Sequence, residues 1–142
     1  MALIAISLPN GKDERVKEDS VIVVRELADI ERRLGKISTE SKSIIFTSSG
    51  TIYPALEASE VAGKLSGVKF AVLSAPNEMP LYVNAEAVTD RDDASKALDD
   101  PRTRSVLHFG SGKKAPAVRV RETEEELVSI WTRLGLPTEV LA

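Results

Sequence analysis

The sequence predicts an α+β fold made of two tandem copies of a small antiparallel β-sheet unit, each closed by a C-terminal helix. One observation is a change of period near the C terminus, where strand-like alternation at 118–121 precedes a helical pattern at 123–134. The other is a repeated order of turns. SLPN at 7–10 returns as SAPN at 74–77, and SG at 49–50 returns as SG at 111–112. We therefore place the first repeat at 1–67 and the second, with the C-terminal helix and tail, at 68–142.

The helix expected at 123–134 carries the clearest local signal in the chain. Thr123 and Glu126 have the spacing of a capping box, in which each side chain accepts a hydrogen bond from the backbone N–H of the other residue. Gly135 and Pro137 end the helix. The apolar residues recur at the spacing of one helical face, so we predict that Trp131 is buried there: Leu127, Ile130, Trp131 and Leu134.

The rest of each repeat consists of strands, turns and short helices. In the first repeat we expect strands at 2–8, 14–18, 21–24, 43–47 and 51–56, and helices at 25–34 and 58–65. In the second repeat we expect strands at 68–74, 105–109 and 118–121. An acidic connection at 90–103 contains a short helical piece at 94–98. Each unit would then have the order strand, turn, strand, connection, strand, turn, strand, helix.

Composition limits the possible classes of function. The chain has 142 residues and a net charge of −3, which argues mildly against a nucleic-acid binder because such proteins usually carry a basic surface. It contains no cysteine, so it forms no disulfide. No apolar run is long enough to span a membrane, and the first residues lack the basic leader of a secretion signal. We expect a soluble protein of the cytoplasm or of a virion, with no membrane partner.

The second repeat resembles a known family through motifs in a fixed order. These are VNA at 83–85, the strand at 106–109 followed by Gly112, and the segment VRVRET at 118–123 followed by Glu125, Glu126 and Leu127. In these motifs the chain resembles the small flagellar and swarming-motility proteins of the FlbD/SwrD type over about 71–134. The first repeat looks like a divergent tandem copy. The resemblance implies a small non-enzymatic β-rich unit and carries no catalytic residue.

Several residues are of types found in catalytic or ion-binding sites, but each has a simpler structural interpretation. His108 is the single histidine, and we expect it to be partly buried on a strand, because no nucleophile turn accompanies it. GSGK at 110–113 lacks the first glycine and the following Ser or Thr of a phosphate-binding loop. The aspartates between 90 and 100 lack the spacing of a calcium-binding loop. We therefore predict no catalytic residue, no cofactor and no metal.

The remaining candidates are surface contacts. The basic residues of the last hairpin form a strip for contact with a partner, and a second basic group lies at 32–36. Two apolar residues lie beyond the last helix, where they gain nothing without a neighbour to cover them. The candidate partner contacts are Val140, Leu141, Lys113, Lys114, Arg119 and Arg121.

These observations favour a non-enzymatic structural or assembly protein that acts by protein–protein contact with other subunits in a larger assembly. By analogy, one form of such a protein is a virion component such as a phage capsid decoration protein. The alternatives are a flagellar or cytoplasmic accessory module, and a nucleic-acid or small-ligand binding module that uses the basic hairpin. Nucleic acid is the less favoured partner because exposed aromatic residues do not interleave with the basic ones.

Overall fold

The computed structural model describes residues 3–28, 40–95, 100–110 and 115–142, and it divides the chain into two compact units. Unit 1 is Met1–Phe70 and unit 2 is Ala71–Ala142. The described residues form two α-helices and ten strands, and the paired strands are antiparallel, which confirms the predicted α+β class.

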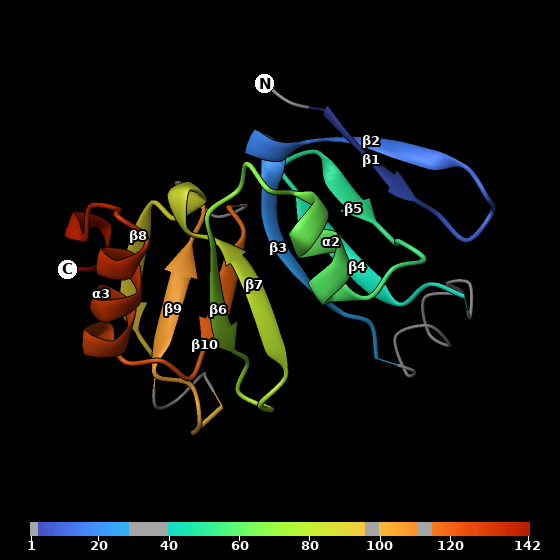
Figure 1. Cartoon of the computed structure of the whole chain (residues 1–142). Coiled ribbons are helices and arrows are strands. Elements are labelled where there is room, and N and C mark those ends of the chain that lie inside the picture. The colour runs from blue at the N-terminus through green and yellow to red at the C-terminus, as the bar shows by residue number, and fades with distance from the viewer. Residues whose placement is uncertain (1–2, 29–39, 96–99, 111–114) are drawn as a thin grey trace. The chain divides into compact units, whose positions relative to one another are not determined.

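Unit 1 is built from a hairpin, three further strands of one sheet and a helix (Figure 1). The sheet has the order β5-β4-β3, and β1 pairs with β2 alone among the described strands. The short 3-10 helix η1 links β2 to β3. The bounds are β1 Leu3–Ser7, β2 Asp13–Lys17, η1 Glu18–Ser20, β3 Val21–Glu26, β4 Ser43–Thr47, β5 Gly50–Ile52 and α2 Ala58–Lys64.

Unit 2 repeats this order of elements and this order of strands. Strand β6 is the neighbour of β7, and the three-stranded sheet has the order β10-β9-β8. A 3-10 helix again links the second and third strands, and a final turn, η3, follows the helix. The bounds are β6 Phe70–Ser74, β7 Pro80–Asn84, η2 Ala85–Ala87, β8 Asp90–Asp93, β9 Ser105–His108, β10 Ala117–Val120, α3 Glu124–Arg133 and η3 Glu139–Leu141.

The repetition extends to single hydrogen bonds in the first turn of each unit. The Asn10 side chain accepts a bond from the backbone N–H of Lys12 at 2.9 Å, and Asn77 accepts one from Met79 at 3.1 Å. Such bonds from an Asn side chain to the backbone two residues later are typical of tight turns. The repeated SLPN and SAPN segments therefore fold into the same turn.

A buried serine ties the fourth strand of each unit to the start of its helix. The Ser43 hydroxyl donates to the carbonyl of Leu56 at 2.7 Å, and the Ser105 hydroxyl donates to that of Glu122 at 2.8 Å. Both serines are fully buried, so each hydroxyl needs this partner. The equivalence follows the sequence repeat, because 43 and 105 lie at matching places in the two units.

The cores of the two units use apolar residues at matching positions. In each unit the hairpin, the sheet and the helix all contribute side chains to the core. Each of the core residues paired below is at most 2 % exposed. Trp131 is 1 % exposed, which confirms that it is buried. The pairs are Ile6 and Leu73, Val16 and Val83, Ile45 and Leu107, Val61 and Leu127, and Leu65 and Trp131.

Two expected helical segments are wrong where the structure describes them. Strand β3 runs to Glu26, and the N–H of Leu27 donates to the carbonyl of Lys42 at 3.1 Å, so the start of the helix expected at 25–34 is extended. Pairing with β4 outweighs the local period there. The acidic stretch expected as a connection begins with strand β8, and Ala94 is not helical. The remainders, 29–39 and 96–99, lie outside the described residues.

Candidate functional site

The outer edge of β2 is the first candidate site, and the hydrogen-bond pattern of its hairpin defines it. The N–H of Leu8 donates to the carbonyl of Lys12 at 2.8 Å, and the register pairs Ile6 with Glu14. Because bonded and non-bonded pairs alternate along an antiparallel ladder, the backbone groups at 13, 15 and 17 point away from β1. These groups form an edge to which another strand can bind.

The other side of the hairpin is covered within unit 1. The N–H of Ala55 donates to the carbonyl of Ser7 at 2.9 Å, so the chain after β5 lies against β1. Unit 2 makes the matching bond from Arg121 to Ser74 at 2.8 Å. In unit 1, therefore, β1 is an inner strand and β2 is an edge strand.

Charged side chains line this edge. Asp13, Glu14, Arg15 and Lys17 are exposed, whereas Val16 is 2 % exposed and belongs to the core. Among the residues that the structure describes, none of these four side chains forms an ion pair or a hydrogen bond. The edge therefore offers both charge and backbone groups to a partner.

The third strand of unit 2, β8, is protected by its own chain. The side chain of Asp90 accepts the N–H of Arg91 at 2.9 Å. The C-terminal turn η3 packs beside β8 and α3. Leu141 of this turn is fully buried, and Val140 is half-buried. Leu141 is therefore not the exposed partner contact that the sequence suggested, because the tail folds back onto its own unit.

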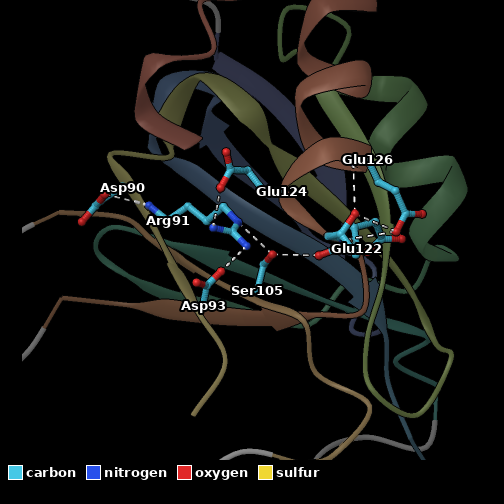
Figure 2. A network of polar contacts seen from close by, with 8 residues as sticks. Asp90, Arg91, Asp93, Ser105, Glu122, Glu124 and Glu126 are labelled. Atoms are coloured by element: carbon cyan, nitrogen blue, oxygen red, sulfur yellow. Dashed lines mark hydrogen bonds and ion pairs between the residues drawn. The ribbon is translucent and has the colours of Figure 1, made fainter. Parts of the chain in front are cut away.

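A buried arginine on β8 forms the second candidate site (Figure 2). The Arg91 side chain is 6 % exposed, and its Nε donates to the hydroxyl of Ser105 at 2.9 Å. Its Nη2 lies 2.7 Å from a carboxylate oxygen of Asp93, and its Nη1 lies 3.4 Å from one of Glu124. Two carboxylates thus neutralise a charge that would otherwise be costly to bury.

An open depression of about 430 Å³ lies over this cluster and combines both signs of charge. Its lining contains two arginines and three acidic residues, so it has no strong preference for a cation or an anion. Lining residues are Arg91, Asp93, Arg104, Thr123, Glu124 and Glu125. The guanidinium of Arg91 already bonds to residues of its own unit, which assigns the cluster a structural role.

Unit 1 has no arginine at the position that corresponds to Arg91. Val24 occupies the position of Arg91 and is fully buried. Glu26, at the position of Asp93, accepts the N–H of Ala58 at the start of α2, at 3.1 Å. Sequence reasoning missed the Arg91 cluster. A signal was present, because the alignment of the two repeats that matches Val21 with Val88 also matches Arg91 with Val24, a valine of the core.

The basic strip expected on the last hairpin is only partly described. Lys113 and Lys114 lie outside the described residues, as does the group at 32–36. Arg121 forms an ion pair with Glu78 at 2.8 Å, and Arg119 is exposed. Of the four residues in the strip, two therefore lie outside the described residues and Arg121 is engaged within its own unit.

His108 forms a surface pair and is not part of a catalytic arrangement in the described residues. Its Nε2 lies 2.8 Å from a carboxylate oxygen of Asp92 on the neighbouring strand. The side chain is 31 % exposed. Because side chains alternate along a strand, both groups lie on the face of the β8–β9 pair opposite to the core leucine Leu107.

The acidic residues do not converge on one point in the part that the structure describes. Asp90, Asp92 and Asp93 lie on β8, where alternate side chains point to opposite faces. Asp100 forms its own ion pair with Arg102, 3.0 Å away, and the hydrogen bond from Arg102 holds the pKa of the Asp100 carboxyl below its ordinary value. Within the described ranges, no group of three or more His, Cys, Asp or Glu is placed to bind a metal ion.

Comparisons with other proteins add no relative. No family model, no curated protein and no solved structure matches the chain. Across the described residues, no helix is long and apolar enough to cross a membrane.

Proposed function

We propose that this chain is a non-enzymatic assembly protein that acts by contact with other protein subunits through the open edge of β2. The observation that carries the proposal is the hairpin geometry. Its outward backbone groups at 13, 15 and 17 face away from β1 in a strand whose charged side chains have no described partner. Addition of a strand to such an edge is a common mode of protein recognition.

The polar groups elsewhere support this proposal because they pair within their own units. Arg91 bonds to Ser105 and Asp93, and Arg121 bonds to Glu78. Such pairs stabilise the units and leave few groups for chemistry on a substrate. The edge of β2 differs because its groups gain hydrogen bonds only from water or from a partner.

The proposal covers more than one biological form. A virion component such as a capsid decoration protein and a flagellar accessory module are both assembly proteins of this kind. Both would use a small folded unit to bind to a larger structure. The proposal concerns the mode of action, which is strand-edge contact.

The test is the size of the particle that contains the chain in its native cells. We expect the tagged full chain to elute in a particle well above its own mass of 15.4 kDa. Arg15→Pro should release it from that particle, because proline removes an outward N–H from the edge. Arg15→Ala is the matched control, since it removes the side chain and keeps the N–H.

Two outcomes would count against the proposal. One is a chain that elutes as a monomer from its native cells. The other is a particle that Arg15→Pro leaves intact. Circular dichroism and the melting temperature of both variants must match those of the parent chain, so that a loss of binding is separated from a loss of folding.

A further inference from the structure

We infer that the partner of the β2 edge is β2 of a second copy of this chain, paired antiparallel about a two-fold axis. This inference depends on the proposed function and names its partner. It starts from the order of residues along β2, which is Asp13, Glu14, Arg15, Val16 and Lys17. The strand is acidic at its first end and basic at its last.

Such an order is complementary to itself when the strand is reversed. In the register centred on Arg15, Asp13 of each copy lies opposite Lys17 of the other. The two pairs are equivalent by the two-fold axis, so each copy contributes one acid and one base. Opposite charges directly across an antiparallel pair stabilise it, whereas like charges destabilise it.

The same register places the correct backbone groups together. Residues 13, 15 and 17 are those whose N–H and C=O groups point away from β1, and in this register they face one another. The carbonyl of Lys17 also accepts a bond from the hydroxyl of Ser20 at 2.7 Å, and its second lone pair remains for a partner. The hairpins of two copies would then form one four-stranded sheet.

The central Arg15 pair is the unfavourable element of this register. Each Arg15 has both Asp13 and Lys17 of the second copy as diagonal neighbours, so one diagonal contact is attractive and the other repulsive. On the opposite face, Glu14 of one copy lies across from the buried Val16 of the other. The two directly opposed acid–base pairs therefore stand against one contact between like charges.

Charge also explains why a second copy fits better than an unrelated acidic or basic strand. Charged residues on an edge usually prevent pairing with other chains. A uniformly acidic partner would meet Asp13 and Glu14, and a uniformly basic one would meet Arg15 and Lys17. A strand with the reversed order leaves only the central Arg15 pair in conflict, and the chain itself supplies that strand. Closed two-fold dimers are the commonest protein oligomers.

The test uses charge reversal and measures the dimer dissociation constant of the purified full chain by analytical ultracentrifugation. Asp13→Lys places two lysines across from each other, and Lys17→Asp places two aspartates there. Each single variant should weaken the dimer about tenfold or more, because both symmetric pairs become repulsive. The double variant Asp13→Lys/Lys17→Asp should restore dimerisation to within a few-fold of the parent chain.

Mixing the two single variants provides a second readout. Each variant alone should be mainly monomeric at a concentration where an equimolar mixture forms a heterodimer, because lysines of one then face aspartates of the other. Lys69→Asp is the matched control, since Lys69 is exposed in unit 1 and lies outside β2. It should leave the dissociation constant unchanged.

The outcomes separate this inference from the proposed function. A purified chain that stays monomeric at all concentrations would overturn the β2–β2 dimer. So would a double variant or a mixture that fails to dimerise. If the particle in native cells still depends on the N–H of residue 15, the proposed function survives with a different partner. If both experiments show only monomer, both are wrong.

Discussion

At the scale of single residues, Trp131 is the largest fully buried side chain of the described structure, and it lies beside Leu127 on α3. Leu65 occupies the matching place in unit 1 and is also fully buried. The larger side chain gives unit 2 more apolar area to bury in its core.

We predict that Trp131→Ala lowers the free energy of unfolding by about 3–5 kcal/mol, the usual loss when a large aromatic is removed from a core. Urea denaturation followed by circular dichroism measures this change. Thr132→Ala is the control, because Thr132 is exposed on the same helix and should change stability by less than about 0.5 kcal/mol. A variant as stable as the parent would show that the core has collapsed around the missing ring.

Arg91 and Val24 provide a reciprocal test of the buried charge. Arg91→Met should leave stability within about 1 kcal/mol of the parent or raise it, because methionine fills the same space and the two carboxylates left behind, 87 % and 52 % exposed, stay hydrated. Val24→Arg should cost about 3–5 kcal/mol. In unit 1 one carboxylate is missing, since Ala58 stands in place of Glu124, and Glu26 is already bonded.

The same urea titration measures both variants. If Arg91→Met and Val24→Arg lower the free energy of unfolding equally, Arg91 is required for the stability of unit 2. Its partners would then stabilise the buried charge by more than the cost of removing that charge from water. A tolerated Val24→Arg would mean that unit 1 contains a hidden place for the guanidinium.

The burial of Trp131 could be predicted from the sequence and that of Arg91 could not, for a physical reason. Trp131 lies on a helical face whose period is visible in the chain, so its burial follows from local spacing. The burial of Arg91 depends on β8 pairing with β9 and on α3 supplying Glu124, a residue 33 positions away. No local pattern contains that contact, and the stretch DRDD looks like a solvated loop.

At the scale of elements, the C-terminal turn η3 is part of unit 2 rather than a free tail. Leu141 is fully buried, and η3 packs beside β8 and α3. We predict that deleting Thr138–Ala142 lowers the free energy of unfolding by about 1.5–3 kcal/mol, the contribution expected from one large buried apolar side chain.

Urea denaturation of the deletion variant checks this prediction, with Val140→Ala as the control because Val140 is only half-buried. An unchanged free energy of unfolding would mean that the tail adds little to the stability of unit 2 and is again a candidate contact for a partner. The sequence showed two apolar residues beyond the helix, but their neighbours on β8 could not be identified without the fold.

Turns, caps and the last helix could be predicted from sequence, because each depends on residues within a few positions of one another. The capping box of Thr123 and Glu126 is present as expected, with the Glu126 N–H donating to the Thr123 hydroxyl at 3.3 Å. The early part of the helix expected at 25–34 failed because pairing between β3 and β4 continues to Glu26. Long-range pairing decided that element.

At the scale of the whole molecule, the matching order of strands supports the tandem arrangement that the turns suggested. Both units have a hairpin, three further strands in the same order and a closing helix. The sequence boundary between 67 and 68 and the structural one between Phe70 and Ala71 differ by the start of β6. What the sequence could not show is that an edge remains open on β2.

The two-fold pairing proposed for β2 limits the size of the assembly that the purified chain forms by itself. Each chain contains one β2, and the contact uses that strand on both sides, so pairing closes at two copies. We predict that the mass from light scattering rises with concentration and levels at twice 15.4 kDa. Mass that continues to grow would indicate a head-to-tail contact instead.

The place of β2 in the first unit also determines valency. Because the open edge belongs to unit 1, a dimer joined through it carries two copies of unit 2. Any surface that binds unit 2 would then meet a bivalent ligand, and the second binding event would become intramolecular. Such linkage raises the apparent affinity by about 10²–10⁴ when the geometry allows both sites to be engaged. A weak contact by unit 2 would thereby become a durable attachment to a surface with repeated binding sites.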